Sequence, residues 1–246
     1  MILPHAFDLA DVKSAMEGMC VQQMAYQCKY YLKDSKQASK RRSMLLSCFH
    51  TLDDCRFTLE TLEIAASIVD RYFASKDGTD LASKADSSVI RLVYMTGLYT
   101  AIKVAEPSCV SPYMVRLWAG RQFSEDEVTA MESRMLQAIG WRVSNPTVTA
   151  FVQHCMALLT DEFLVVPEDK TDFETIATYQ AALSVLDHSL LNVEPSVIGL
   201  AAVKNALGED VDYAADYITM VGDLLRIDPW SEEMEQTQSK LEKCEA

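Results

Sequence analysis

Apolar residues recur at helical spacing along most of the 246-residue chain. Between residues 41 and 55 they occupy positions i, i+3, i+4 and i+7, and a similar stripe runs from 58 to 75. The first stripe consists of Leu45, Cys48, Phe49 and Leu52, and the second of Leu59, Leu62, Ala66, Val69 and Phe73. Alternating strand patterns are scarce, and only 8 glycines and 7 prolines interrupt the chain. The pattern predicts an all-α protein of about eleven helices and no strand.

Capping signals predict where several helices begin. Ser124 and Glu127 have the S-x-x-E spacing of a capping box. Thr171 and Glu174 repeat that spacing before a second apolar stripe. Further starts are expected at Asn145–Pro146, at Asp228–Pro229, and at Pro195, whose helix Gly208 is expected to close.

The spacing of loops and a short repeat predict two helical domains. Polar stretches at 76–87 and 160–171 are expected to be loops, and the junction between domains is expected near 144–146. SVIRL at 88–92 and SVIGL at 196–200 agree in four of five residues, and each opens an apolar helix. The expected divisions are an N-terminal helix and linker at 1–36, a first domain at 37–145, and a second, acidic domain with a C-terminal helix at 146–246.

The net charge of −14 is unevenly distributed along the chain. Residues 1–145 hold 17 basic and 17 acidic side chains, whereas residues 146–246 hold 5 basic and 19 acidic ones. An acidic half repels phosphate and no basic stripe offsets it, so we expect no nucleic-acid partner. We interpret the acidic half as a solvated surface that keeps the protein soluble.

The cysteines and the absence of common catalytic motifs narrow the expected cell compartment and exclude several classes of function. Seven cysteines without a CxxC pair favour reduced thiols and an intracellular protein, in the nucleus or the cytoplasm. His154 and Cys155 have no second pair at zinc spacing, so no metal site is expected. No apolar run is long enough to span a membrane, and the first residues have the composition of mature sequence rather than a signal peptide. Without GxSxG, GxGxxG or GxxxxGKS/T, we expect neither an enzyme nor a cofactor or small-molecule ligand.

Four charged residues lie where apolar ones are expected. Arg41 continues the first apolar stripe, and Asp70 lies at the margin of the second. Glu132 lies inside the apolar arc of its helix, and Lys103 ends a long apolar helix. Because a buried charge without a partner is very costly, we expect Arg41 and Asp70 to form an ion pair. For Lys103 and Glu132 two interpretations stay open: ordinary helix-end and boundary residues that reach water, or anchors for the backbone of a partner.

The segment 41–73 resembles the first two helices of a cyclin box, most specifically in its ETL and VDRYF motifs. LYTAIKVAE at 98–106 is similar to the segment written ASKYEE in many cyclins, and 125–152 to the family pattern around its LGW and PT motifs. VEPSVIGLAAVKNAL at 193–207 is similar to part of the second cyclin fold. The resemblance covers roughly residues 37–240 and is stronger in the first half.

This resemblance implies two tandem five-helix cyclin folds preceded by an N-terminal helix. It also implies the regulatory subunit of a cyclin-dependent protein kinase, acting in cell-cycle control and cell division, with the catalytic residues on the kinase. Lys103 and Glu132 correspond to the family's residues that hold the kinase's regulatory helix. The remaining correspondences are the bracing ion pair, Arg41 and Asp70, and the apolar kinase contacts, Leu136, Trp141 and Val143.

The first motif departs from the family pattern. Many cyclins begin the box with an apolar groove that docks substrates, but Lys40 replaces its methionine and Ser47 its tryptophan. We therefore do not expect substrate docking on this surface. Two alternatives stay open: a divergent cyclin-fold adaptor without kinase activation, and a transcription-type scaffold, which would need a basic surface that this chain lacks.

Overall fold

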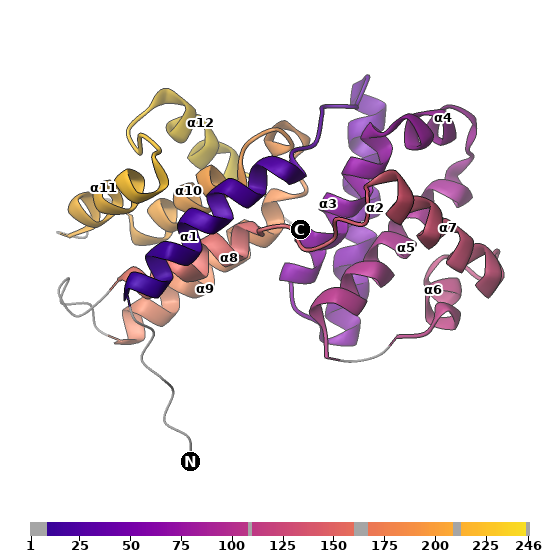
Figure 1. Cartoon of the computed structure of the whole chain (residues 1–246), viewed down its shortest axis with the longest axis horizontal. Coiled ribbons are helices and arrows are strands. Elements are labelled where there is room, and N and C mark those ends of the chain that lie inside the picture. Colours follow the sequence, from indigo (N-terminus) through magenta and orange to yellow (C-terminus); the bar gives the residue numbers. More distant parts are fainter. Residues whose placement is uncertain (1–8, 108–109, 160–166, 209–212, 245–246) are drawn as a thin grey trace, which may run out of the picture. The chain divides into compact units, whose positions relative to one another are not determined.

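The computed structural model describes residues 9–107, 110–159, 167–208 and 213–244. Within these ranges the regular structure consists of twelve α-helices and two short 3-10 turns, without a strand. This confirms the all-α class expected from the spacing of apolar residues. No helix in the described part combines the length and apolar character needed to cross a membrane. Packing divides the chain into two units (Figure 1).

One unit, named the α2–α7 unit, comprises Tyr26–Asn145 and the later segment Val185–Asn192. Its elements are α2 (Ser35–Cys55), α3 (Glu60–Ala74), α4 (Lys76–Lys84), α5 (Ser87–Ala105), α6 (Pro112–Trp118), α7 (Glu125–Ala138) and the 3-10 turn η3 (His188–Leu190). The central helix α5 packs against α2, α3, α6 and α7 (Figure 1). Every residue from Leu92 to Ile102 is buried, which explains why this stretch carries no charge until Lys103.

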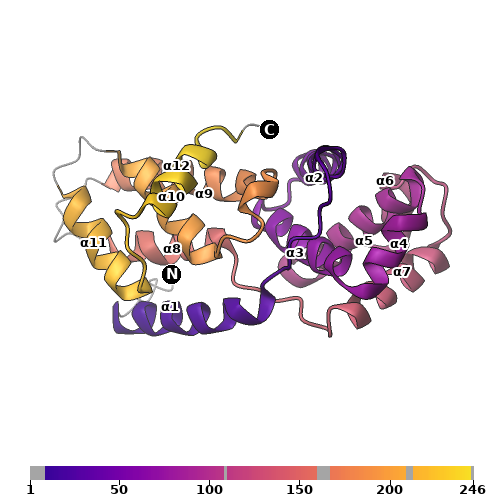
Figure 2. The same ribbon diagram turned by 90° about the horizontal axis from the view of Figure 1, so that it is seen from above.

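The other unit, named the α8–α12 unit, comprises Met1–Ala25, Pro146–Ser184 and Val193–Glu245. Its elements are α1 (Leu9–Gln23), α8 (Val148–Leu158), α9 (Pro167–Ser184), α10 (Pro195–Leu207), α11 (Ala214–Leu225) and α12 (Glu232–Leu241), and the 3-10 turn η1 (Met24–Tyr26) follows α1. The central helix is α10, which packs against α8, α9, α11 and α12 (Figure 2). The predicted domain limits of 37–145 and 146–246 stay a prediction.

The helix α1 packs against α8 and α11 within this second unit. Its last residue, Gln23, is buried and supplies the start of α10 with hydrogen-bond partners. Gln23 Nε2 donates to Glu194 Oε2 at 2.9 Å, and the Ser196 amide donates to Gln23 Oε1 at 3.2 Å. Because the first amides of a helix have no partner within it, this glutamine takes the place of a local cap.

Three of the predicted helix limits are confirmed. Ser124 and Glu127 form a reciprocal capping box at the start of α7. Pro195 and Gly208 bound α10, with Gly208 at a positive φ of 70°.

The other predicted starts are wrong by a few residues. The cap of α8 is Thr147, which accepts from the Ala150 amide, and the cap of α12 is Ser231, which accepts from the Met234 amide. In both places a hydroxyl group that follows the proline accepts a hydrogen bond from an amide in the first turn of the helix. The proline therefore lies before the helix. The helix α9 begins at Pro167, so Thr171 lies inside it rather than at its cap.

The predicted loop at 76–87 is also wrong, because it contains α4. Ser75 caps this helix by accepting from the Gly78 amide. Gly78 lies directly against the Tyr72 carbonyl, at a place where a Cβ atom would clash. The second predicted loop, 160–171, has residues 160–166 outside the described residues, and its last five residues are helical.

Candidate partner-binding site

Lys103 and Glu132 meet at the edge between two packed helices of the α2–α7 unit. Lys103 lies in the last turn of α5, and Glu132 lies on α7. Lys103 Nζ is 2.5 Å from Glu132 Oε1. The lysine side chain is 40% exposed, whereas the glutamate side chain is only 12% exposed. The pair therefore has one half-buried anion and one cation that reaches solvent.

Two neighbours on α5 orient this pair. Thr100 Oγ1 donates to Glu132 Oε1 at 3.0 Å, one turn before the lysine. The Lys103 ammonium lies 4.3 Å from the centre of the Tyr99 ring, a cation–π distance. An ammonium has three donors and a carboxylate has two acceptor oxygens. Both groups thus keep hydrogen-bonding capacity for the backbone of another chain.

The apolar residues expected near this pair lie at the end of α7. Leu136 and Val143 are half-buried, and Trp141 is 64% exposed. The Trp141 amide donates to the Leu136 carbonyl at 2.8 Å, and the Gly140 amide donates to the Gln137 carbonyl at 3.2 Å. With Gly140 at φ 65°, these bonds form a Schellman motif, which ends α7 and joins Leu136 to Trp141 through the backbone.

Arg41 and Asp70 are brought together inside the α2–α7 unit. Arg41 Nε donates to Asp70 Oδ1 at 2.9 Å, and Nη2 donates to Oδ2 at 2.7 Å, with side chains 3% and 7% exposed. Arg41 Nη1 also donates to the Val185 carbonyl at 2.6 Å, and Tyr31 Oη donates to Asp70 Oδ1 at 2.7 Å. Burial alone would lower the pKa of Arg41, but the adjacent carboxylate outweighs it and raises that pKa. The guanidinium therefore stays charged in the core.

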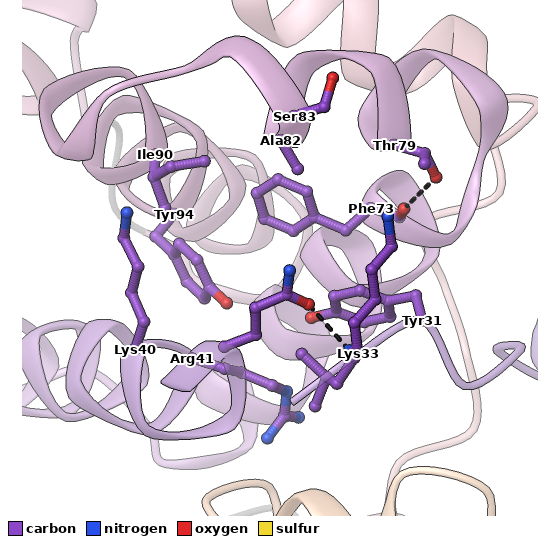
Figure 3. A pocket seen from close by; sticks show the side chains of 12 residues that line it. Tyr31, Lys33, Lys40, Arg41, Phe73, Thr79, Ala82, Ser83, Ile90 and Tyr94 are labelled. Atoms are coloured by element: carbon purple, nitrogen blue, oxygen red, sulfur yellow. Dashed lines mark hydrogen bonds between the residues drawn. The ribbon is translucent and has the colours of Figure 1, made fainter. Parts of the chain in front are cut away.

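A cavity of about 160 Å³ lies beside Arg41 (Figure 3). Its wall includes the rings of Tyr31, Phe73 and Tyr94, and Lys40 also lines it. Ser47, the other departure from the family groove, donates to the Ser43 carbonyl of its own helix. The cavity lies along the first half of α5, so it is a feature separate from the pair at Lys103.

Sequence patterns did not single out several residues that shape these sites. The sequence pattern did not indicate a role for Thr100 or Tyr99, because both lie in the apolar run of α5. Glu106 accepts from the Thr58 amide, from Thr58 Oγ1 and from Thr61 Oγ1, and so joins the start of α3 to the end of α5. Arg71 donates to the carbonyl of Arg142, beyond α7. The VDRYF motif contained this arginine, but its acceptor is a backbone atom and leaves no signal in the sequence.

Comparison with known proteins shows the family to which this chain belongs. The model of the cyclin N-terminal domain matches residues 14–144, more than half of the chain. Cyclin-A3-2 of Arabidopsis thaliana is 26% identical over 147 residues, which cover 58% of this chain and 36% of that protein. The G2/mitotic-specific cyclin C13-1 of Daucus carota is 30% identical over 141 residues, covering 56% of this chain and 38% of the relative. The chain thus matches well under half the length of these relatives.

Solved structures share the fold. A viral cyclin from herpesvirus saimiri superposes with a TM-score of 0.68 at 13% identity, covering 96% of this chain and 97% of that one. A chain of the CAK complex from Chaetomium thermophilum bound to ATP-gamma-S has a TM-score of 0.54 at 15% identity, covering 97% of this chain and 85% of that one. The tandem helical layout, the family match over residues 14–144 and the cyclin relatives together show that this chain belongs to the cyclin family.

Proposed function

We propose that this cyclin binds a cyclin-dependent protein kinase and activates it by positioning the kinase's regulatory helix. The observation that carries the proposal is the pair of Lys103 and Glu132, joined at the edge of α5 and α7. A lysine there can donate to the carbonyls left free at the end of a partner helix, and a glutamate can accept from its amides. Leu136, Trp141 and Val143 would supply the apolar contacts around these anchors.

Lys103 and Glu132 should gain more free energy from bonds to a kinase backbone than they lose from their bond to each other. Because Lys103 is 40% exposed, its bond to Glu132 contributes about 0–1 kcal/mol in the free protein. Charge-assisted bonds to a partner's backbone contribute about 1.5–3 kcal/mol each when well formed. Burial of the exposed Trp141 ring would add to this, since buried tryptophans often dominate the energetics of an interface.

The proposed effect on the kinase is a shift between its conformations. A cyclin that binds the inward position of the regulatory helix more tightly than the outward position increases the fraction of active kinase. That position places the helix's glutamate on the lysine that contacts ATP. All catalytic groups then belong to the kinase, and this chain needs no cofactor of its own.

A charge reversal tests this assignment. Lys103→Glu should abolish binding to recombinant cyclin-dependent kinases of the source cell, because it sets two carboxylates against each other and removes the donor. The measurements are affinity capture and phosphorylation of a histone substrate by the captured kinase. Arg134→Glu is the matched control, since Arg134 is 41% exposed and paired with Asp77 on another helix of the same unit. The control should bind normally.

A double variant tests whether Lys103 and Glu132 only stabilise the fold or also bind the kinase. Lys103→Glu with Glu132→Lys restores opposite charges but reverses the polarity presented to the kinase. We expect it to regain the parental melting temperature without regaining kinase binding. Parental capture and activity by the single or the double variant would overturn the assignment of this pair. Failure of the parental chain to capture any kinase would instead support the adaptor alternative, which the altered Lys40 and Ser47 positions keep open.

A further inference from the structure

We propose that Arg71 is a positioning residue that holds the segment after α7 so that Trp141 faces a partner. The inference rests on the proposed function, because it assigns Trp141 to the kinase interface. Its structural half, the control of Trp141 by Arg71, can be measured without any kinase. The segment Gly140–Val143 is called the strap below.

The strap is fixed at its first end by the Schellman motif that ends α7. Its next residue, Trp141, has φ 60°, in the left-handed region that bulky side chains rarely adopt. Such a conformation persists only where the surroundings hold it. Because the indole is 64% exposed, burial of its own ring does not provide that restraint.

Arg71 supplies a restraint immediately after the tryptophan. It lies in the last turn of α3, and its Nη2 donates to the Arg142 carbonyl at 2.6 Å. Its Nε donates to the Ser67 carbonyl of its own helix at 3.2 Å, which orients the guanidinium. The planar fork of arginine can make both bonds at once, whereas a lysine cannot reproduce this geometry.

The same guanidinium also contacts Tyr26. Arg71 Cζ lies 4.8 Å from the centre of the Tyr26 ring, a cation–π contact. Burial lowers the pKa of Arg71 to about 10, so the group remains charged at neutral pH. One cation thus joins α3, the strap and the residue that ends η1. The exposed Trp141 lies between the Schellman motif and the Arg142 carbonyl that Arg71 holds. Its indole is therefore kept in solvent and does not fold back against α7.

The structural half is tested by the fluorescence of Trp141 in the full chain. Trp118→Phe and Trp230→Phe leave Trp141 as the sole tryptophan of the three. In this background Arg71→Met keeps an unbranched stem but removes every donor, and we expect the anisotropy of Trp141 to fall. Arg71→Lys should restore part of it, because an ammonium can still donate to one carbonyl. Arg134→Met, which removes an arginine bonded to Asp77 and not to the strap, should leave the anisotropy unchanged.

The binding half is tested with the recombinant kinase used above. We expect Arg71→Met to weaken kinase affinity about tenfold, as expected for a moderate contributor to an interface. Arg71→Lys should fall between it and the parental chain, and Arg134→Met should bind normally. All variants are compared well below their melting temperatures, so that global unfolding is not mistaken for a local change in the position of Trp141.

The outcomes separate this inference from the proposed function. Unchanged anisotropy in Arg71→Met overturns the positioning role directly. If Lys103→Glu abolishes binding but Arg71→Met binds like the parent, the proposed function stands and this inference fails. If neither substitution affects binding, the kinase site itself is wrong, and the binding half of the inference fails with it.

Discussion

The two arginine–aspartate pairs of the α2–α7 unit differ far more in burial than in geometry. Arg41 and Asp70 are almost fully buried, whereas Arg134 and Asp77 are each 41% exposed, although each pair has two hydrogen bonds from one guanidinium to one carboxylate. Removal of one partner of a buried pair leaves an unpaired charge in the core, while an exposed charge is solvated by water. Burial should therefore decide how much each carboxylate contributes to stability.

Asp70→Ala should destabilise the protein by about 3–5 kcal/mol, because Arg41 would keep only its bond to the Val185 carbonyl. Tyr31 would lose its acceptor in the same variant. The measurement is the midpoint of chemical denaturation at constant pH. Asp77→Ala is the matched control and should change the free energy of unfolding by only about 1 kcal/mol. Equal shifts for the two variants would contradict the role assigned to burial.

Glu106 links stability to pH. Burial alone would raise its pKa, but hydrogen bonds from Thr61 and Thr58 outweigh this and lower the pKa below its usual value. A carboxylate with a depressed pKa in the folded state contributes stability above its unfolded pKa of about 4.3 and loses it as pH falls through the folded pKa. The wild-type protein should therefore lose part of its stability in acid through this residue.

Glu106→Gln keeps an acceptor oxygen but removes the charge. We expect it to lower the melting temperature at pH 7 and to differ less from wild type as the pH is taken below about 4.3. Thermal unfolding of both proteins across that range checks the expectation. A difference in melting temperature that is the same in acid and at neutral pH would show that the charge of Glu106 is irrelevant to its hydrogen bonds at the start of α3.

At the scale of elements, the packing of α5 against α3 depends on a glycine. A Cβ atom at Gly97 would clash with Val69 Cγ2, and it would lie 3.5 Å from Met135 Cε. The side chain of valine has little rotational freedom, so Val69 cannot easily move aside. The two helices can therefore cross at this distance only because position 97 has no side chain.

Gly97→Ala should destabilise the protein by about 1–3 kcal/mol, despite the better helix propensity of alanine. Gly18→Ala on α1 is the matched control, because nothing lies within 4 Å of the added Cβ. That control should gain up to about 1 kcal/mol from helix propensity. Denaturation midpoints of the two variants should move in opposite directions, and a shift of both toward stability would show that α3 and α5 can separate at no cost.

At the scale of the whole molecule, the sequence predicted those features that repeat along a helix. The stripes through Leu45 and Val69 predicted α2 and α3, because one apolar face per helix is needed to build a core. Ser124 marked the start of α7 because its capping box is local in sequence. The charges of Arg41 and Asp70 stood out against these stripes, which made an ion pair predictable.

Other features were not predictable, because they depend on contacts between distant segments. From the end of α5, Glu106 accepts from the Thr58 amide just before α3, and from the end of α1, Gln23 accepts from the Ser196 amide of α10. Each such bond joins a side chain to a backbone group, and the backbone carries no residue-specific signal. The starts of α8 and α12 were wrong because several nearby residues can cap a helix, and packing selects among them.

The segment Val185–Asn192 has a consequence for the autonomy of the first cyclin fold. It follows α9 in the chain, yet it packs with α2 and provides the third acceptor for the Arg41 guanidinium. A polypeptide cut after Asn145 would therefore retain every helix from α2 to α7 but lose a ligand of its most deeply buried cation. The α2–α7 unit is therefore discontinuous along the sequence, and we expect a polypeptide ending at Asn145 to unfold at a lower denaturant concentration than the full chain.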